Sequence, residues 1–425
     1  MRSFLRTSRA ARNALSVGEV WLPSCHRSLA TQNTAARLPL RSTTAVNATN
    51  CAGSVARGQL YAAAHTARGF ATGEASKVTD SLHVGTSDIK ALLPGDASKF
   101  YELAGTTERQ FLPEGCPALL SEFEATKTRN LMIRSPFFRL LDVVSPDRTG
   151  DSSIPPVAKG TQLHLEGPTG SGKSVLLAQL THWARASGWL VLYVPSARYY
   201  LSNSSFSKDE SGLVNTPDTA CDLLKSLHAA HASQLAGITL KDGTNLGELV
   251  EAGARYTAAA GVASEVMDAA LKVLKALQEE DLGVPTLVVL DEFNSLFAGS
   301  EFMEVPSLRH SRLYGAHELR LAKALRDMAV PPAHGARVVA SSASTAVSPR
   351  VRVEVPVEAR RRMPLFEYLE IAQYIAHLKE SNRMPASFEP KDISKYQFLS
   401  GGNAASLRNL VLAYGFSGNE VAQEA

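Results

Sequence analysis

Short apolar runs alternate with longer amphipathic stretches between residues 160 and 340 of the chain. An unbroken apolar run of this length is typical of a strand that is buried on both faces, as the strands of parallel sheets are. A strand, a helix and a second strand within about 35 residues indicate a βαβ unit. We therefore predict an α/β fold with a parallel sheet, whose strands lie at 162–166, 189–194, 286–290 and 337–340 and whose helices include 174–184, 266–277 and 318–328.

The regions on either side of this core have other patterns. Residues 73–158 form a leader that either folds alone or drapes over neighbouring molecules, and its richness in turn formers suggests draping. After Pro356 the pattern becomes helical, first at 365–378 and then at 404–414. We therefore divide the chain beyond residue 70 into an N-terminal extension (71–158), a core (159–350) and a helical C-terminal region (351–425).

The first 70 residues differ in charge from the rest. They contain nine arginines, no lysine, one acid, Glu19, and fourteen serines and threonines. Segments rich in arginine and serine and poor in acids are typical of organelle transit peptides. The sequence Ala67-Arg-Gly-Phe70 resembles a matrix-processing site, so we predict a mitochondrial transit peptide over 1–70. The alternatives are a disordered basic tail that binds nucleic acid or a membrane, and a chloroplast address, which arginine at this density disfavours.

Removal of this segment would change the charge of the protein. Because the whole chain carries +3 and the first 70 residues carry +8, residues 71–425 carry a net −5. A stand-alone nucleic-acid-binding protein needs many phosphate contacts from a basic face, so that class is disfavoured. The four cysteines include no close pair, which excludes a disulfide scaffold and gives no cysteine spacing for zinc. No run of 18 apolar residues is present, so we predict no membrane span.

A glycine-rich loop follows the first predicted strand of the core. Gly167-Pro-Thr-Gly-Ser-Gly-Lys-Ser174 matches the phosphate-loop pattern G-x-x-x-x-G-K-[ST] in full and opens a predicted helix. The glycines let the backbone curl so that its N–H groups and the helix N-terminus cradle phosphates. We expect Lys173 to reach the β- and γ-phosphates and Ser174 to bind Mg²⁺. The predicted nucleotide-binding residues of the loop are Gly167, Thr169, Gly170, Ser171, Gly172, Lys173 and Ser174.

Two acids end the strand at 286–290. Asp291 is expected at the carboxyl edge of the sheet, beside the loop, where it would hold Mg²⁺ together with Ser174. Glu292 could orient or deprotonate an attacking water, so Asp291 and Glu292 are the candidate catalytic residues. The alternatives are that Asp291 only caps a helix and that Glu292 faces away from the site.

Other polar residues are weaker candidates. Ser341 or Ser342 ends the next strand, where a polar group could sense the γ-phosphate, although a simple turn serine is the alternative. Arg408, in the last predicted helix, could reach the phosphates from a C-terminal lid, or could be a solvated surface arginine. The run Arg360-Arg-Arg362 is either a solvated face or a contact for RNA or a protein partner.

Several stretches together resemble the death-associated protein three family, the P-loop GTP-binding protein of the mitochondrial small ribosomal subunit. The resemblance covers roughly residues 85–420. It rests on the leader, the phosphate loop, Asn130-Leu-Met-Ile-Arg-Ser-Pro136, Gly188-Trp-Leu-Val-Leu-Tyr-Val-Pro-Ser-Ala-Arg-Tyr-Tyr200, Leu287-Val-Val-Leu-Asp-Glu-Phe-Asn-Ser-Leu296 and Leu399-Ser-Gly-Gly-Asn403 with Leu407-Arg408.

The resemblance implies an AAA+-like P-loop NTPase core with a helical C-terminal lid and an N-terminal extension. It further implies a purine nucleotide, GTP or ATP with GTP favoured, bound with Mg²⁺ by Gly170, Lys173 and Ser174. The implied partners are small-subunit ribosomal proteins and rRNA, near the intersubunit bridges, in the mitochondrial matrix. A link to cell death in animals is proposed for the family. In the family the position of Glu292 is often not acidic, which suits slow or absent hydrolysis, whereas this chain retains the acid.

Three functions are compatible with these observations. The first is a structural, nucleotide-bound component of the mitochondrial small ribosomal subunit that contributes to translation. The second is a mitochondrial AAA+-type ATPase that acts in protein remodelling or ribosome assembly, with Arg320 or Arg326 as the arginine supplied in trans. The third is a signalling NTPase switch built on the same core.

Overall fold

The computed structural model describes residues 81–145, 162–257, 262–307, 310–328, 337–341, 353, 356–384 and 392–417. All of them belong to one compact unit, Phe70–Ala425. The predicted transit peptide and the candidate Ser342 lie outside the described residues.

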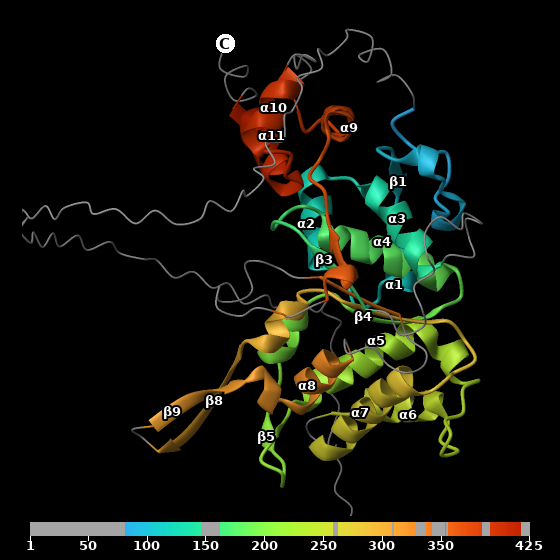
Figure 1. The fold of residues 1–425 in the computed structure, drawn as a ribbon, viewed down its shortest axis with the longest axis vertical. Helices are drawn as coiled ribbons and strands as arrows, with labels where there is room; N and C mark the ends of the chain where they lie inside the picture. Colours follow the sequence, from blue (N-terminus) through green and yellow to red (C-terminus); the bar gives the residue numbers. More distant parts are fainter. Residues whose placement is uncertain are drawn as a thin grey trace, which may run out of the picture. The chain divides into compact units, whose positions relative to one another are not determined.

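Five parallel strands form the central sheet, in the order β11-β3-β10-β7-β4 (Figure 1). The four strands predicted from apolar runs are confirmed. The βαβ unit has parallel strands as expected, but β10 and β7 lie between its two strands. The order of the strands in the sheet cannot be predicted from their apolar runs, because these runs are similar in all of them. The strands are β3 (Gln162–Glu166), β4 (Leu190–Val194), β7 (Thr286–Leu290), β10 (Arg337–Ser341) and β11 (Arg360–Arg362).

Every residue of β4 and β7 is buried, and because successive side chains point to opposite faces, both faces of the sheet are covered at these strands. Leu190 and Leu192 of β4 join one hydrophobic core, whereas Val191 and Tyr193 join the other. The first core is completed by α5 (Pro217–Leu235), α6 (Leu246–Ala254), α7 (Ala263–Glu279) and α8 (Arg320–Asp327), and the second by α2 (Pro117–Thr126), α3 (Ser135–Val144) and α4 (Lys173–Ala186). Helix α1 (Gly105–Phe111) contacts α4 but has no buried side chain.

Residues 81–145 are part of this second core, so the expectation that the leader drapes over other molecules is wrong for its described part. Strands β1 (Phe100–Glu102) and β2 (Asn130–Met132) pair antiparallel. The buried guanidinium of Arg185, on α4, donates at 2.6 and 2.9 Å to the carboxylate of Glu114 in the α1–α2 turn. An ion pair buried in this way ties the N-terminal segment to the helix that follows the phosphate loop.

The C-terminal helices form a third core of their own. They are α9 (Tyr368–Glu380), α10 (Asp392–Ser400) and α11 (Ala404–Ser417), drawn in red and orange in Figure 1. Phe100 of β1 and Met132 of β2 share this core, so the β1–β2 pair packs against the C-terminal helices. Among the helices of the described ranges, none combines the length and apolarity needed to span a bilayer.

Two hairpins and an edge strand complete the fold. The arginine run predicted as a solvated face or a contact site is strand β11, whose residues are exposed while its backbone pairs with β3. The hairpin β8–β9 projects from the body of the unit in Figure 1. The hairpin strands are β5 (Ser207–Lys208), β6 (Val214–Asn215), β8 (Gly299–Ser307) and β9 (His310–Gly315).

Candidate functional site

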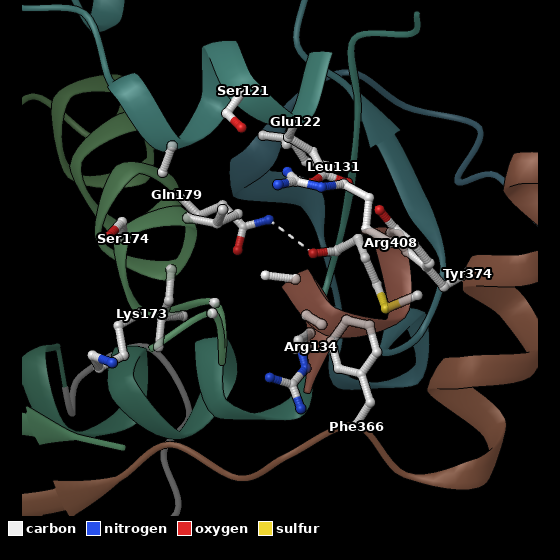
Figure 2. A pocket seen from close by; sticks show the side chains of 18 of the residues that line it. Ser121, Glu122, Leu131, Arg134, Lys173, Ser174, Gln179, Phe366, Tyr374 and Arg408 are labelled. Atoms are coloured by element: carbon white, nitrogen blue, oxygen red, sulfur yellow. Dashed lines mark hydrogen bonds and ion pairs between the residues drawn. The ribbon is translucent and has the colours of Figure 1, made fainter. Parts of the chain in front are cut away.

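A cavity of about 290 Å³ lies at the carboxyl edge of the central sheet. Its walls come from α2, β2, α4 and the loop before it, the residues after β7, α9 and α11. Figure 2 shows Lys173, Ser174 and Gln179 of α4 on one side, facing the C-terminal elements across the cavity. Segments distant in sequence thus form a single site.

The structure brings most of the predicted nucleotide-binding residues to this cavity. Gly167 and Ser171 belong to the same loop without lining the cavity. Ser341 ends β10 between β3 and β7, so its backbone lies at the same edge of the sheet. The predicted residues that line the cavity are Thr169, Gly170, Gly172, Lys173, Ser174, Asp291, Glu292 and Arg408.

The loop curls where glycine permits it. Gly170 has a φ of +82° and Gly172 a φ of +94°, both in the left-handed region that glycine adopts without steric cost. Gly172 caps α4, so the first turn of this 14-residue helix starts at the cavity wall. The N–H groups at such a helix start attract anions.

The Lys173 side chain is buried inside the curl of the loop. Its Nζ donates at 2.9 Å to the carbonyl oxygens of both Gly167 and Pro168. Burial lowers the pKa of Lys173, and the negative charge of nearby Asp291 opposes this shift. The site therefore contains a preplaced cation next to a buried acid.

Asp291 and Glu292 have different environments. Asp291 is 3% exposed. Its backbone N–H donates at 2.8 Å to the carbonyl oxygen of Val194, which extends the pairing of β7 with β4 by one residue. Glu292 has a φ of 55°, a left-handed conformation that costs a non-glycine residue about 1–2 kcal/mol. Its carboxylate accepts a hydrogen bond from the Ser196 hydroxyl, just beyond β4. The Glu292 side chain is thus held by the neighbouring strand end.

The wall opposite the loop combines apolar side chains with one polar cluster. Glu122 of α2 accepts from Arg408 at 2.9 Å and from the Tyr374 hydroxyl at 2.5 Å. Burial, reinforced by the charge of Glu122, raises the pKa of Tyr374, which keeps the phenol protonated as a donor. Arg408 is therefore paired with an acid rather than solvated. The apolar part of the wall is formed by Phe100, Leu131, Met132, Phe366 and Ala404.

Helix α11 begins directly on the phosphate loop. Asn403 caps this helix by accepting from the N–H of Ser406 at 3.0 Å, and its Nδ2 donates at 2.7 Å to the carbonyl oxygen of Thr169. The N–H of Ala405 donates at 3.1 Å to the carbonyl oxygen of Gly170. The position of the C-terminal helices is therefore coupled to the conformation of the loop.

Arg134, between β2 and α3, also connects the phosphate loop to the C-terminal part of the chain. Its guanidinium donates at 2.7 and 2.9 Å to both carboxylate oxygens of Glu370 on α9 and at 3.1 Å to the carbonyl oxygen of Ser171. It also donates to the carbonyl oxygens of Pro364 and Leu365. Its Cζ lies 4.5 Å from the centre of the Phe366 ring, a cation–π contact seen in Figure 2.

An alanine substitution at Gly170 would test how closely α11 packs against the loop. A Cβ at this position would lie 2.7 Å from both Ala405 Cβ and Asn403 Oδ1, whereas one at Gly188, with φ +80°, would meet nothing within 4 Å. Gly170→Ala and Gly188→Ala thus share the left-handed strain of about 1–2 kcal/mol, and only the former adds a clash. We expect a clearly larger fall in unfolding midpoint for Gly170→Ala in urea. Equal falls would contradict the close docking of α11.

The sequence of the chain matches a known family over the part that carries this site. The model of the mitochondrial ribosomal death-associated protein 3 family matches residues 156–398, which is more than half of the chain. This chain is a member of that family. The matched part of this family member contains the phosphate loop and both acids, whereas Arg134, Asn403 and Arg408 lie outside it.

Two individual proteins are also similar to this family member. Small ribosomal subunit protein mS29 of Mus musculus is 25% identical over 234 residues, which cover 51% of this chain and 55% of the mouse protein. The chain therefore spans about half the length of this relative. Cdc6p from Pyrobaculum aerophilum has a TM-score of 0.29 and 11% identity, with coverage of 74% of this chain and 66% of that one. Family membership confirms the predicted mitochondrial localisation.

Several residues of the site escaped prediction from sequence. Arg134 follows an apolar strand within a stretch that resembles the family, but no spacing marks it as part of a nucleotide site. Glu122 lies on a helix without a recognisable motif, and Gln179 lies on the predicted helix 174–184 but beyond the phosphate-loop motif. Conversely, Arg320, a candidate for an arginine acting in trans, donates to Asn215 and Asp268 and is paired with Asp209 within the chain.

Proposed function

We propose that this protein is a nucleotide-binding component of the mitochondrial small ribosomal subunit that contributes to translation. In this proposal a purine nucleoside triphosphate, with Mg²⁺, holds together the elements around the cavity. The observation that carries it is a buried lysine, Lys173, near a buried acid, Asp291, in a cavity lined by residues of the β1–β2 pair, the phosphate loop and the C-terminal helices. A ligand that binds only the folded state at a thousandfold excess over its Kd stabilises that state by about 4 kcal/mol.

The roles of the residues follow from their chemistry. The N–H groups of the curled loop around Gly170 and the ammonium of Lys173 would contact the phosphates. The Ser174 hydroxyl and the Asp291 carboxylate are oxygen ligands of the kind Mg²⁺ takes. The base would occupy the apolar wall around Leu131 and Phe366. GTP is proposed over ATP on the family resemblance, and the helices α9–α11 would act as the lid of an AAA+-like P-loop NTPase.

Slow or absent hydrolysis is part of the proposal. Glu292 is the residue that would orient or deprotonate water, and its carboxylate is engaged by Ser196. A base held by another donor is less available to a water molecule. An acid that is present at position 292 but held by Ser196 is consistent with a nucleotide that stays bound and is hydrolysed slowly or not at all.

Removal of the hydrogen bond from Ser196 to Glu292 should therefore raise the rate of nucleotide hydrolysis. A hydrogen bond to a charged group contributes about 1.5–3 kcal/mol, so we expect Ser196→Ala to increase single-turnover phosphate release by about tenfold or more. Glu292→Gln should abolish this gain in the double variant while leaving nucleotide binding unchanged. A lower rate in Ser196→Ala would mean that the serine positions the glutamate for catalysis instead of restraining it.

The ribosomal role draws its support from the family and from mS29, together with the surface of the fold. The predicted mature chain is acidic, which suits a subunit held largely by ribosomal proteins. The exposed arginines of β11 are the proposed contact for rRNA.

The test is a sucrose gradient of mitochondrial lysate in magnesium, followed by identification of the nucleotide that accompanies this chain. Quantitative migration with the small subunit, carrying intact and unexchanged GTP, is the expected result. Migration as a free protein or a ring-sized oligomer whose nucleotide turns over would replace the proposal with an AAA+-type ATPase that acts in remodelling or assembly.

A further inference from the structure

Two histidines and a glutamate meet beside α9, and none of the three lines the nucleotide cavity. They are His83, in the segment before β1, and His377 and Glu380, one helical turn apart on α9. One potential ligand atom from each lies within 4.8 Å of the others. The Nε2 of His83 and an Oε of Glu380 are 2.7 Å apart.

The hydrogen bonds around His377 engage one of its two ring nitrogens. His377 Nε2 lies 3.0 Å from the Thr128 hydroxyl oxygen, and this hydroxyl also lies 3.2 Å from the hydroxyl oxygen of Thr126. When Thr128 donates to Thr126, the Thr128 oxygen is left to accept from His377 Nε2. In that tautomer Nδ1 of His377 carries a lone pair that can bind a metal ion.

The other ring nitrogen, Nδ1, is buried and unsatisfied. His377 is 2% exposed, and its Nδ1 has no hydrogen-bond partner among the described residues. Burial lowers the pKa of His377 to about 4, so the ring is neutral at physiological pH. The ring also stacks on Phe100 with centroids 4.1 Å apart, which fixes its orientation. A buried ring nitrogen without a partner is destabilising, and a cation bound to its lone pair would remove that cost.

We propose that His83, His377 and Glu380 bind one Zn²⁺ ion, through Nε2 of His83, Nδ1 of His377 and a carboxylate oxygen of Glu380. Two imidazoles and a carboxylate form a zinc ligand set that leaves a fourth position for water, and the exposed side of Glu380 leaves room for it. Thr128 completes the site, because a metal-binding histidine usually donates its other ring N–H to a fixed acceptor.

The ion would join the segment before β1 to α9. That helix also carries Glu370, which binds Arg134, and Tyr374, which lines the nucleotide cavity. The zinc would therefore stabilise the docking of the C-terminal helices without taking part in nucleotide chemistry. The proposal stands independently of nucleotide binding, since none of its three ligands lines that cavity.

The test is Zn²⁺ binding to the full chain, stripped with a chelator and kept in excess nucleotide and Mg²⁺. Titration calorimetry and metal analysis should give one more tightly bound Zn²⁺ per chain in the wild type than in His83→Ala or Glu380→Gln. Zn²⁺ should also raise the unfolding temperature of the wild type alone. His310→Ala, an exposed histidine on β9, is the matched control and should behave like the wild type.

Any zinc bound by the cysteines and histidines of residues 1–70 is common to all four proteins and cancels in the comparison. Both ligand substitutions are at partly or largely exposed side chains, so folding should be retained. Nucleotide retention measured in the same samples separates this proposal from the previous one. Equal Zn²⁺ stoichiometry and affinity in the wild type and in both ligand variants would overturn the zinc site.

Discussion

Replacement of Lys173 by alanine is expected to abolish nucleotide binding, with a loss of affinity of about a hundredfold or more. The ammonium would exchange two carbonyl contacts for phosphate oxygens, and each hydrogen bond to a charged group contributes about 1.5–3 kcal/mol. Two such contacts correspond to a factor of about 10² to 10⁴ in Kd. The measurement is the nucleotide content of the purified chain, followed by titration of the stripped protein with labelled GTP and ATP.

The control for this variant is Lys275→Ala. Lys275 lies on α7 with its side chain 71% exposed, so its removal should leave affinity unchanged. Unfolding of the stripped Lys173→Ala protein should be compared with that of the stripped wild type, because the loop carbonyls lose their donor as well. Unchanged nucleotide retention in a folded Lys173→Ala protein would refute the assignment of the site.

Local pattern was sufficient to predict the half of the site built from the sheet. This half consists of three contiguous segments: the strand before the loop, the loop itself and the strand that precedes Asp291. In each segment the local structure alone dictates which residue types can be used. A buried parallel strand must be apolar, and a backbone that curls around phosphates needs glycine. Such requirements are legible without knowledge of the remaining fold.

The opposite half of the site could not be predicted in this way. Arg134 and Glu370 are 236 positions apart, and neither belongs to a motif. Their meeting depends on the packing of α9 against β1 and β2, which involves ordinary apolar residues such as Phe100 and Ile375. Similarly, β11 has three charged side chains and no strand pattern, because its backbone pairing to β3 rather than its side chains places it in the sheet.

The second large effect concerns stability. Arg134→Ala is expected to lower the free energy of unfolding by about 3–5 kcal/mol, the cost of breaking a buried ion pair by removal of one partner. The side chains of Arg134 and Glu370 are only 7% and 9% exposed, so the remaining carboxylate would stay largely desolvated. The carbonyl oxygens of Ser171, Pro364 and Leu365 would lose a donor as well.

The effect of Arg134→Ala should also reach the nucleotide. Because Arg134 joins the loop to α9, its loss should loosen the C-terminal helices and speed nucleotide dissociation in addition to lowering the urea midpoint. Glu370→Ala should cost a similar amount, since it strands a buried guanidinium. The double variant should cost clearly less than the sum of the two, because neither charge is then left unpaired.

Arg255→Ala provides the matched control for a broken ion pair. Arg255 pairs with Glu251 one turn away at the end of α6, where their side chains are 75% and 46% exposed. Solvent screens such a pair, so its loss should change the unfolding free energy by about 0.5 kcal/mol or less. Two results would show that the contact does not couple the loop to the C-terminal helices. One is an Arg134→Ala variant that unfolds at the same urea concentration as Arg255→Ala. The other is a double variant whose loss of unfolding free energy equals the sum of the losses in Arg134→Ala and Glu370→Ala.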